Sequence, residues 1–166
     1  MNKSTSKKII IIISYTIIVS FVCLHLMINV YQHSIVTNIL KQKISSSLRG
    51  KEINIEPKTK ADVLLFLHLN LVDIHEYVDI TYDCKHFTID LVVDATLQGF
   101  KVGVVSIGFN DSIVGHIIAV FETTDEGIIY VEPQSDNILD LKLNELCPQQ
   151  EIYGNVNYIS DPVWST

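Results

Sequence analysis

The sequence predicts an α+β protein: one N-terminal transmembrane helix followed by one small domain in which a helix packs on an antiparallel sheet. Two observations support this division. Residues 9–40 contain no Lys, Arg, Asp or Glu, whereas all 19 Asp and Glu lie after residue 50. In the later part, segments with the apolar period of a helix precede Val- and Ile-rich segments separated by turn residues, a pattern typical of strands.

The N-terminal part predicts a membrane anchor. Residues 1–8 form a basic tail with three lysines, and residues 9–31 are dominated by Ile, Val, Leu and Phe. At about 1.5 Å per residue, a helix over 9–31 is long enough to cross a hydrocarbon layer of about 30 Å. A cleaved signal peptide is the alternative, but its apolar core is normally shorter and no Ala-x-Ala-like cleavage site follows.

Charge gives an expected orientation for this helix. Lys and Arg are about equally frequent on its two sides, but those before it are closer to the apolar segment. The C-terminal part is also acidic. We therefore expect a single-pass protein of the cell membrane, with the N-terminus in the cytoplasm, the domain outside, and the lipid bilayer as a partner of the helix.

Residues 32–58 are predicted to be an amphipathic stalk and linker. Ile35, Ile39 and Ile44 recur at roughly helical spacing, and Ser45–Ser47 with Gly50 ends the pattern. An apolar face of this kind could pair with another copy, so self-association through the stalk is possible. The alternating residues 52–56 then predict a short strand that ends at Pro57.

Residues 59–166 are predicted to form the folded domain. Thr59 and Asp62 resemble a capping box and open a helix over residues 63–78. A second helix starts near Cys84 and is closed by Gly99. Turn residues then separate a series of expected strands, which cover residues 100–109, 114–123 and 128–132, with weaker candidates at 138–143 and 153–159.

Three residues are candidates for catalysis: Cys84, His116 and Glu132. Cys84 lies in the expected first turn of its helix, where unpaired backbone N–H groups and the helix dipole favour a thiolate. His116 is near the start of one strand and Glu132 at the end of the next. If these strands pair across the turn at residues 124–127, the imidazole and the carboxylate come close together at one edge of the sheet.

These motifs resemble the transglutaminase-like superfamily, in which a cysteine at a helix start is followed by a histidine and an acidic residue on adjacent antiparallel strands. The matching residues are Tyr82-Asp83-Cys84 with Phe87, then Gly115-His116, then Tyr130-Val131-Glu132-Pro133. The resemblance covers about residues 60–140. It departs from the family at Glu132, because an aspartate before the proline is usual there. Asp136 is the reserve candidate for this role.

The resemblance implies acyl transfer or hydrolysis at an amide or peptide carbonyl. Cys84 would attack the carbonyl, His116 would act as base and then as acid, and Glu132 would orient the imidazole. The backbone N–H of Cys84 would meet the oxyanion. The alternative is a transglutaminase-like module that has lost turnover and only binds a peptide or protein partner.

Other readings compete for the same side chains. In an oxidising compartment Cys84 and Cys147 could form a structural disulfide. Cys84, His86 and His116 could ligate a metal, although their spacing does not match a zinc module. No motif points to a cofactor, so we expect neither a cofactor nor a metal.

The acidic excess limits the possible partners. From Lys51 onward the 19 acidic residues face only six lysines, a net charge of about −13. Such a domain disfavours nucleic acid as a partner. A cationic or neutral peptide or protein substrate is electrostatically easier to bind.

Overall fold

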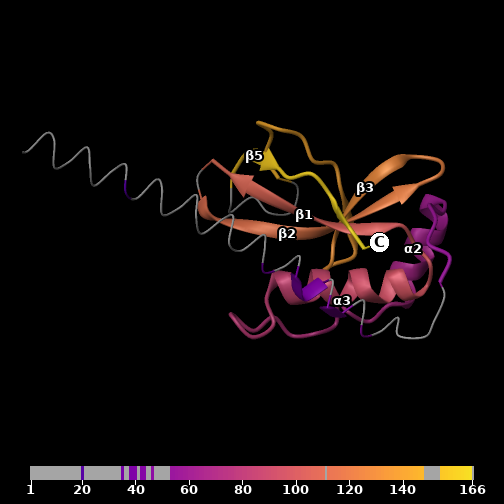
Figure 1. Cartoon of the computed structure of the whole chain (residues 1–166). Helices are drawn as coiled ribbons and strands as arrows, with labels where there is room; N and C mark the ends of the chain where they lie inside the picture. The colour runs from indigo at the N-terminus through magenta and orange to yellow at the C-terminus, as the bar shows by residue number, and fades with distance from the viewer. Residues whose placement is uncertain are drawn as a thin grey trace, which may run out of the picture. The chain divides into compact units, whose positions relative to one another are not determined.

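The computed structural model describes most of the chain after residue 52 and a few residues before it (Figure 1). The described residues are 20, 35, 38–40, 42–43, 46, 53–110, 112–147 and 154–165. The chain separates into two compact units, Met1–Val36 and Thr37–Thr166. The fold described below is that of the second unit.

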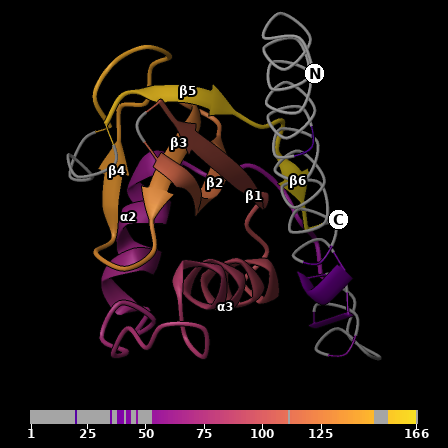
Figure 2. The same cartoon turned by 90° about the vertical axis from the view of Figure 1, so that its left-hand side faces the viewer.

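A six-stranded antiparallel sheet is the main element of this unit (Figure 2). Its strands are β1 (Val102–Phe109), β2 (Ser112–Thr123), β3 (Gly127–Glu132), β4 (Asn137–Leu139), β5 (Val156–Ile159) and β6 (Val163–Trp164). The order is β4-β3-β2-β1-β5, and β6 also pairs with β1. β5 and β6 occupy different ends of the same β1 edge, at Ile107–Phe109 and Gly103–Val104.

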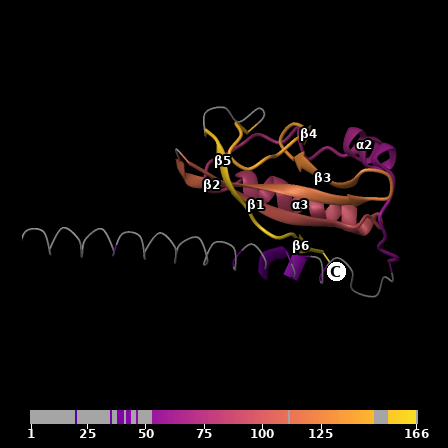
Figure 3. The ribbon, with the colours of Figure 1, turned by 90° about the horizontal axis from the view of Figure 1, so that it is seen from above.

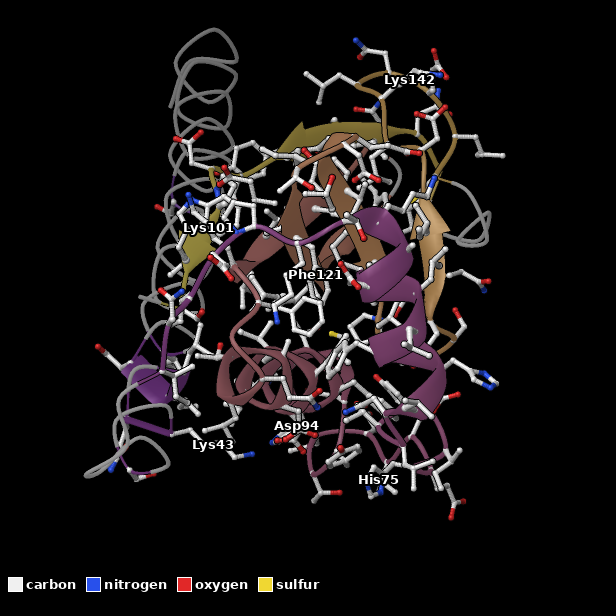
Figure 4. All side chains as sticks on the ribbon, turned by 90° about the vertical axis from the view of Figure 1, so that its right-hand side faces the viewer. Lys43, His75, Asp94, Lys101, Phe121 and Lys142 are labelled. Carbon is white, nitrogen blue, oxygen red and sulfur yellow. The ribbon has the colours of Figure 1, made fainter. Side chains whose placement is uncertain are left out.

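Two described helices accompany the sheet, α2 (Lys60–Leu69) and α3 (Cys84–Leu97). α3 packs along β1 and β2, as the view in Figure 3 shows. Phe66 of α2 packs with Phe100 and Phe121, with ring centroids 5.0 and 6.2 Å from its own. Figure 4 shows Phe121 between the sheet and the helices. One face of the sheet is thus covered by helices.

The C-terminal segments contribute to a second cluster of buried side chains. Val105 and Ile107 of β1 and Ile118 and Val120 of β2 pack there with Leu139, Cys147 and Val156. These strand residues alternate with those that face the helices, as the period of two in a strand requires. The sheet is therefore buried on both faces, and its long apolar strands reflect this.

Capping explains where the helices begin. The predicted capping box at Thr59 is confirmed, because Asp62 N–H donates to the Thr59 hydroxyl and Thr59 N–H donates to the Asp62 carboxylate. α3 has a second capping box between Asp83 and His86. After α3, Gly99 has a φ of +80°, and a Cβ there would lie 2.7 Å from the Asn54 carbonyl oxygen. Only glycine fits this turn.

The predicted fold class is wrong. We expected an α+β transglutaminase-like, papain-like domain behind a transmembrane helix, but the described residues form mostly an antiparallel sheet with few helices. The sequence pattern overstated the helical content. Residues 63–78 were expected to form one helix, yet α2 ends at Leu69. The weak candidates at 138–143 and 153–159 contain strands β4 and β5, and β6 (Val163–Trp164) was not predicted, because short apolar runs carry little periodic signal.

Asn70 explains why α2 is short. Its backbone is extended, its side-chain oxygen accepts from Val72 N–H at 2.9 Å, and its amide donates to Asp94 at 3.0 Å. Local side-chain bonds of this type compete with helix continuation. Similarly, residues 53–58 do not form a strand but make single bridges, Glu56 to Phe100 and Lys58 to Thr123.

The predicted membrane localisation also needs correction. In the part of the chain that the structure describes, no helix has the length and apolar character needed to cross a membrane. The expectation of a single-pass membrane protein is therefore not supported. The basic tail at 1–8 and the helix expected at 9–31 lie outside the described residues, apart from Ser20, as does most of the stalk expected at 32–58.

Candidate active site

Cys84 is the first residue of α3, and its position is fixed by the cap that precedes it. The Asp83 carboxylate accepts from Lys85 N–H at 3.0 Å, and His86 Nδ1 lies 3.0 Å from the same carboxylate. Burial favours the neutral acid, but hydrogen bonds from Lys85 and His86 outweigh it and keep the pKa of Asp83 below its ordinary value. The cap thus holds the start of α3, and His86 serves that cap.

His116 and Glu132 meet at the end of the β2–β3 pairing. Their strands pair in register from Thr123 with Gly127 to Ala119 with Val131. The same register extended by one step would place Glu132 opposite Ile118, two residues from His116, so both side chains lie on the Ile118 face of the sheet, the face of the second buried cluster. His116 Nε2 lies 2.5 Å from Glu132 Oε2, and only 5% and 3% of the two side chains are exposed.

The buried imidazole interacts with Cys84 as well. Burial alone would lower the pKa of His116, but hydrogen bonds to Cys84 and Glu132, with the charges of both, raise it to about 9. His116 therefore interacts with both residues, and together they hold its proton more tightly than an ordinary imidazole would.

The second oxygen of Glu132 is also engaged. Oε1 accepts from Gln134 backbone N–H at 3.3 Å, and the Gln134 side-chain amide lies 3.4 Å from the same oxygen. These bonds fix the rotation of the carboxylate, so that Oε2 stays directed at His116. Gln134 is thus a positioning residue for Glu132 within the β3–β4 turn.

A direct link joins α3 to the strand that carries His116. Thr88 is fully buried, and its hydroxyl oxygen lies 2.8 Å from the carbonyl oxygens of both Cys84 and Ile117. Since a hydroxyl has one hydrogen, the two carbonyls share it. The β2–β3 pairs end at Ala119 with Val131, and the Ile117 carbonyl, just outside that pairing, bonds to Thr88 of α3. This arrangement brings Cys84 next to His116.

The other candidates lie outside this constellation. Asp136 has a left-handed backbone, with a φ of 56°. Burial and the charge of Asp73 raise the pKa of its carboxyl to about 6. The ionisation of Asp136 is therefore coupled to the charge of Asp73. Glu132 is the acidic residue that contacts His116.

The structure does not join the two described cysteines. Cys84 is partly buried and Cys147 fully buried, and both are thiols. Burial, together with the charge of Glu132, raises the pKa of Cys147. Among the described residues, no group of three His, Cys, Asp or Glu side chains could hold a metal ion, and the alternative set with His86 is not assembled.

Two positioning residues escaped the sequence reasoning. Gln134 could not be found from the sequence, because a glutamine two residues after a strand carries no distinctive pattern. Thr88 resembles any buried helical threonine in the sequence. Its four-residue spacing from Cys84 was the available signal, because a threonine hydroxyl at that spacing can bond the preceding carbonyl.

Comparison with known proteins adds little to this geometry. No protein-family model matches the chain, and no curated protein matches it. Among solved structures, one similar chain is a Polyporus squamosus lectin bound to the human-type influenza-binding epitope Neu5Aca2-6Galb1-4GlcNAc. It is 14% identical with a TM-score of 0.40, and the match covers 61% of this chain and 43% of the lectin chain. At that TM-score the likeness supports no statement about fold or function.

Proposed function

We propose that the protein is a cysteine-dependent hydrolase or acyltransferase that acts on an amide or peptide carbonyl. The observation that carries the proposal is the buried His116, which interacts with both Cys84 and Glu132. A histidine between a thiol at a helix start and a carboxylate is the arrangement that nucleophilic catalysis by cysteine requires. The motifs that resemble the transglutaminase-like superfamily support the same chemistry.

The first step begins from an ion pair. Because His116 holds a proton at neutral pH, it stabilises the Cys84 thiolate, and the positive end of α3 adds to this effect. The thiolate Sγ attacks the substrate carbonyl carbon, a C–S bond forms, and the carbonyl oxygen becomes an oxyanion. The backbone N–H of Cys84 lies in the first helical turn, where it has no acceptor within the helix, and it is the candidate oxyanion donor.

The tetrahedral intermediate then collapses to a thioester. His116 gives a proton to the leaving nitrogen, the C–N bond breaks, and an amine departs. Nε2–H remains directed at the Glu132 carboxylate, which holds the ring in place throughout. Gln134 holds that carboxylate in turn.

Water or a second amine completes the cycle. His116 is neutral after the first step, so it takes a proton from the incoming nucleophile as that nucleophile attacks the thioester carbon. The C–S bond breaks, the thiolate returns, and the imidazolium is restored. Water gives hydrolysis and an amine gives transamidation.

Acylation by an activated ester tests this proposal. Incubation with p-nitrophenyl acetate should give a burst of p-nitrophenol and an acetyl group on Cys84, located by peptide mass spectrometry. Cys84→Ala should remove the burst, and His116→Gln should slow it by about 100-fold, in line with the loss of a general acid–base. Acetylation spread over lysines without a Cys84 adduct would contradict the proposal and favour the binding module.

A further inference from the structure

The loop between α2 and α3 exposes an unusual amount of apolar surface. It covers residues 70–83 and is called here the α2–α3 loop; His75 marks it in Figure 4. Residues 74–81 are all exposed. Within this run Ile74 and Ile80 are 70% and 80% exposed, and Val78 is 46% exposed. Single exposed apolar residues are ordinary, but a group of them on one loop indicates a contact surface.

The backbone of the α2–α3 loop holds one of these side chains outward. Val78 N–H donates to the Tyr82 carbonyl at 3.0 Å, and Tyr82 N–H donates to the Val78 carbonyl at 2.7 Å. Ile80 lies in the middle of this turn with a φ of 69°. A β-branched residue rarely adopts that conformation. A strained, exposed isoleucine contributes nothing to stability, so a role in binding accounts for it better.

The α2–α3 loop borders the candidate active site. At its end, the Tyr82 ring lies 4.7 Å from Phe87 and 5.7 Å from His86, both in the first turn of α3. The Tyr82 hydroxyl also donates to Asp90 at 2.9 Å. At its start, Asp73 is close enough to Asp136 for its charge to act on that carboxyl, in the turn after Glu132. The loop thus reaches both the Cys84 side and the Glu132 side.

The charge of the α2–α3 loop has one sign. Asp73, Glu76 and Asp79 alternate with the exposed apolar residues, whereas the Asp83 that follows them pairs with Lys85 and His86. No Lys or Arg occurs between Lys60 and Lys85. A surface that combines apolar side chains with the carboxylates of Asp73, Glu76 and Asp79 favours a ligand that is both apolar and cationic. The same carboxylates repel anionic lipid headgroups.

We propose that the α2–α3 loop is the substrate-recognition surface, and that it binds a peptide segment in which an apolar side chain stands beside a Lys or Arg. This inference rests on the proposed function, since it names the substrate class of the same site. Ile80 and Val78 contact the apolar side chain, and Glu76 and Asp79 contact the cation. Cys84, which follows the loop directly, then meets the adjacent peptide carbonyl.

Peptidyl acyloxymethyl ketones test the proposal, because they deliver an electrophile to Cys84 on a chosen peptide. Probes ending in Leu-Arg, Leu-Glu and Ser-Arg are compared by the rate of Cys84 labelling. Leu-Arg should react about tenfold faster than either of the others, a discrimination expected of one apolar contact or one charge pair. Ile80→Asn should remove the preference for Leu-Arg over Ser-Arg. The double variant Asp79→Asn with Glu76→Gln should remove the preference for Leu-Arg over Leu-Glu.

Matched controls lie outside the α2–α3 loop. Ile128→Asn removes an exposed isoleucine from β3, and Asp161→Asn removes an exposed carboxylate between β5 and β6. Both should keep all three labelling rates. Asparagine is chosen for Ile80 because it tolerates the left-handed backbone, so the variant folds without added strain.

Three results would overturn the inference. They are equal labelling by the three probes, an unchanged preference in the loop variants, and Ile80-dependent sedimentation with phosphatidylcholine vesicles without any peptide preference. Failure of the proposed function can be told apart from failure of this inference. If the proposed function is wrong, the rate at which iodoacetamide alkylates Cys84 will not depend on His116. In that case fluorescein-labelled Leu-Arg and Leu-Glu peptides are titrated against Cys84→Ala. About tenfold tighter binding of the Leu-Arg peptide supports the recognition surface, and equal binding overturns it.

Discussion

The hydroxyl of Thr88, one turn into α3, lies 2.8 Å from the carbonyl oxygen of Ile117, the residue that follows His116 in β2. This contact joins the helix that carries the thiol to the strand that carries the imidazole. It forms at the point where β2 separates from β3. The buried Thr88 therefore helps to set the distance between Cys84 and His116, although it takes no part in the proposed chemistry.

Replacing Thr88 with valine should loosen this junction. The shape is kept, but the shared hydrogen bond is lost and two partly buried carbonyls lose a donor, so unfolding in urea should show a loss of about 1–2 kcal/mol. Acetylation of Cys84 by p-nitrophenyl acetate should also slow by about tenfold. Thr96→Val is the control, because the Thr96 hydroxyl bonds only within α3, to Val92 at 2.6 Å. Equal acetylation rates in the two variants would show that Thr88 does not position the site.

Glu132→Gln tests the charge on the carboxylate that holds His116. Glutamine keeps the size and can still accept a hydrogen bond, but it removes the negative charge. The pKa of His116 should fall from about 9 toward its ordinary value of 6.5, as followed by NMR of the imidazole protons. Glu122 lies in β2 and forms an ion pair with Lys101, away from His116. Glu122→Gln should therefore leave the His116 titration unchanged. An unaltered titration in Glu132→Gln would mean that Glu132 does not set the state of His116.

The same residue predicts how stability depends on pH. A histidine whose pKa is raised in the folded state stabilises the fold fully below its unfolded pKa of about 6.5, and this stabilisation is lost as pH rises through about 9. The free energy of unfolding should therefore fall between pH 6.5 and 9, by at most about 3 kcal/mol. His116→Gln should flatten this slope in urea titrations. His68→Gln, on an exposed part of α2, should keep it, and a slope that survives in His116→Gln would refute the assignment.

Asp136 predicts a slope at lower pH. Burial and the charge of Asp73 raise its pKa to about 6, so the stabilisation from its neutral form is present below about 3.8 and lost as pH rises through 6. Asp136→Asn removes the charge and suits the left-handed backbone. At pH 7 this variant should be more stable by about 1 kcal/mol, after allowance for solvent screening. Asp140→Asn, on an exposed carboxylate paired with Lys142, should change stability by less than about 0.5 kcal/mol.

The elements that local chemistry defines could be predicted from the sequence. Asp83 before an apolar period is typical of a helix start, and α3 begins at Cys84. The turn at 124–127 fixes which residues of β2 and β3 face each other, so the proximity of His116 and Glu132 follows from counting along the strands. Gly99 marks the end of the helix by its local chemistry too, since only glycine suits the backbone conformation there.

The fold class could not be predicted from the same patterns. The end of α2 depends on contacts of Asn70 with Asp94, which is 24 residues away. β5 and β6 exist because they bond to opposite ends of β1, and two to four residues carry no clear period of their own. Tertiary pairing therefore decided the balance of helix and sheet. The role of Gln134 likewise depends on a turn geometry that a local pattern does not specify.

The reactivity of Cys84 with iodoacetamide, measured with and without His116, tests the central claim most directly. If the buried imidazolium stabilises a thiolate, Cys84 in the native protein should react at pH 6 at least about tenfold faster than in His116→Gln. Cys147 should stay unreactive in both proteins because it is buried. A Cys84 rate that is the same in both proteins would contradict the account.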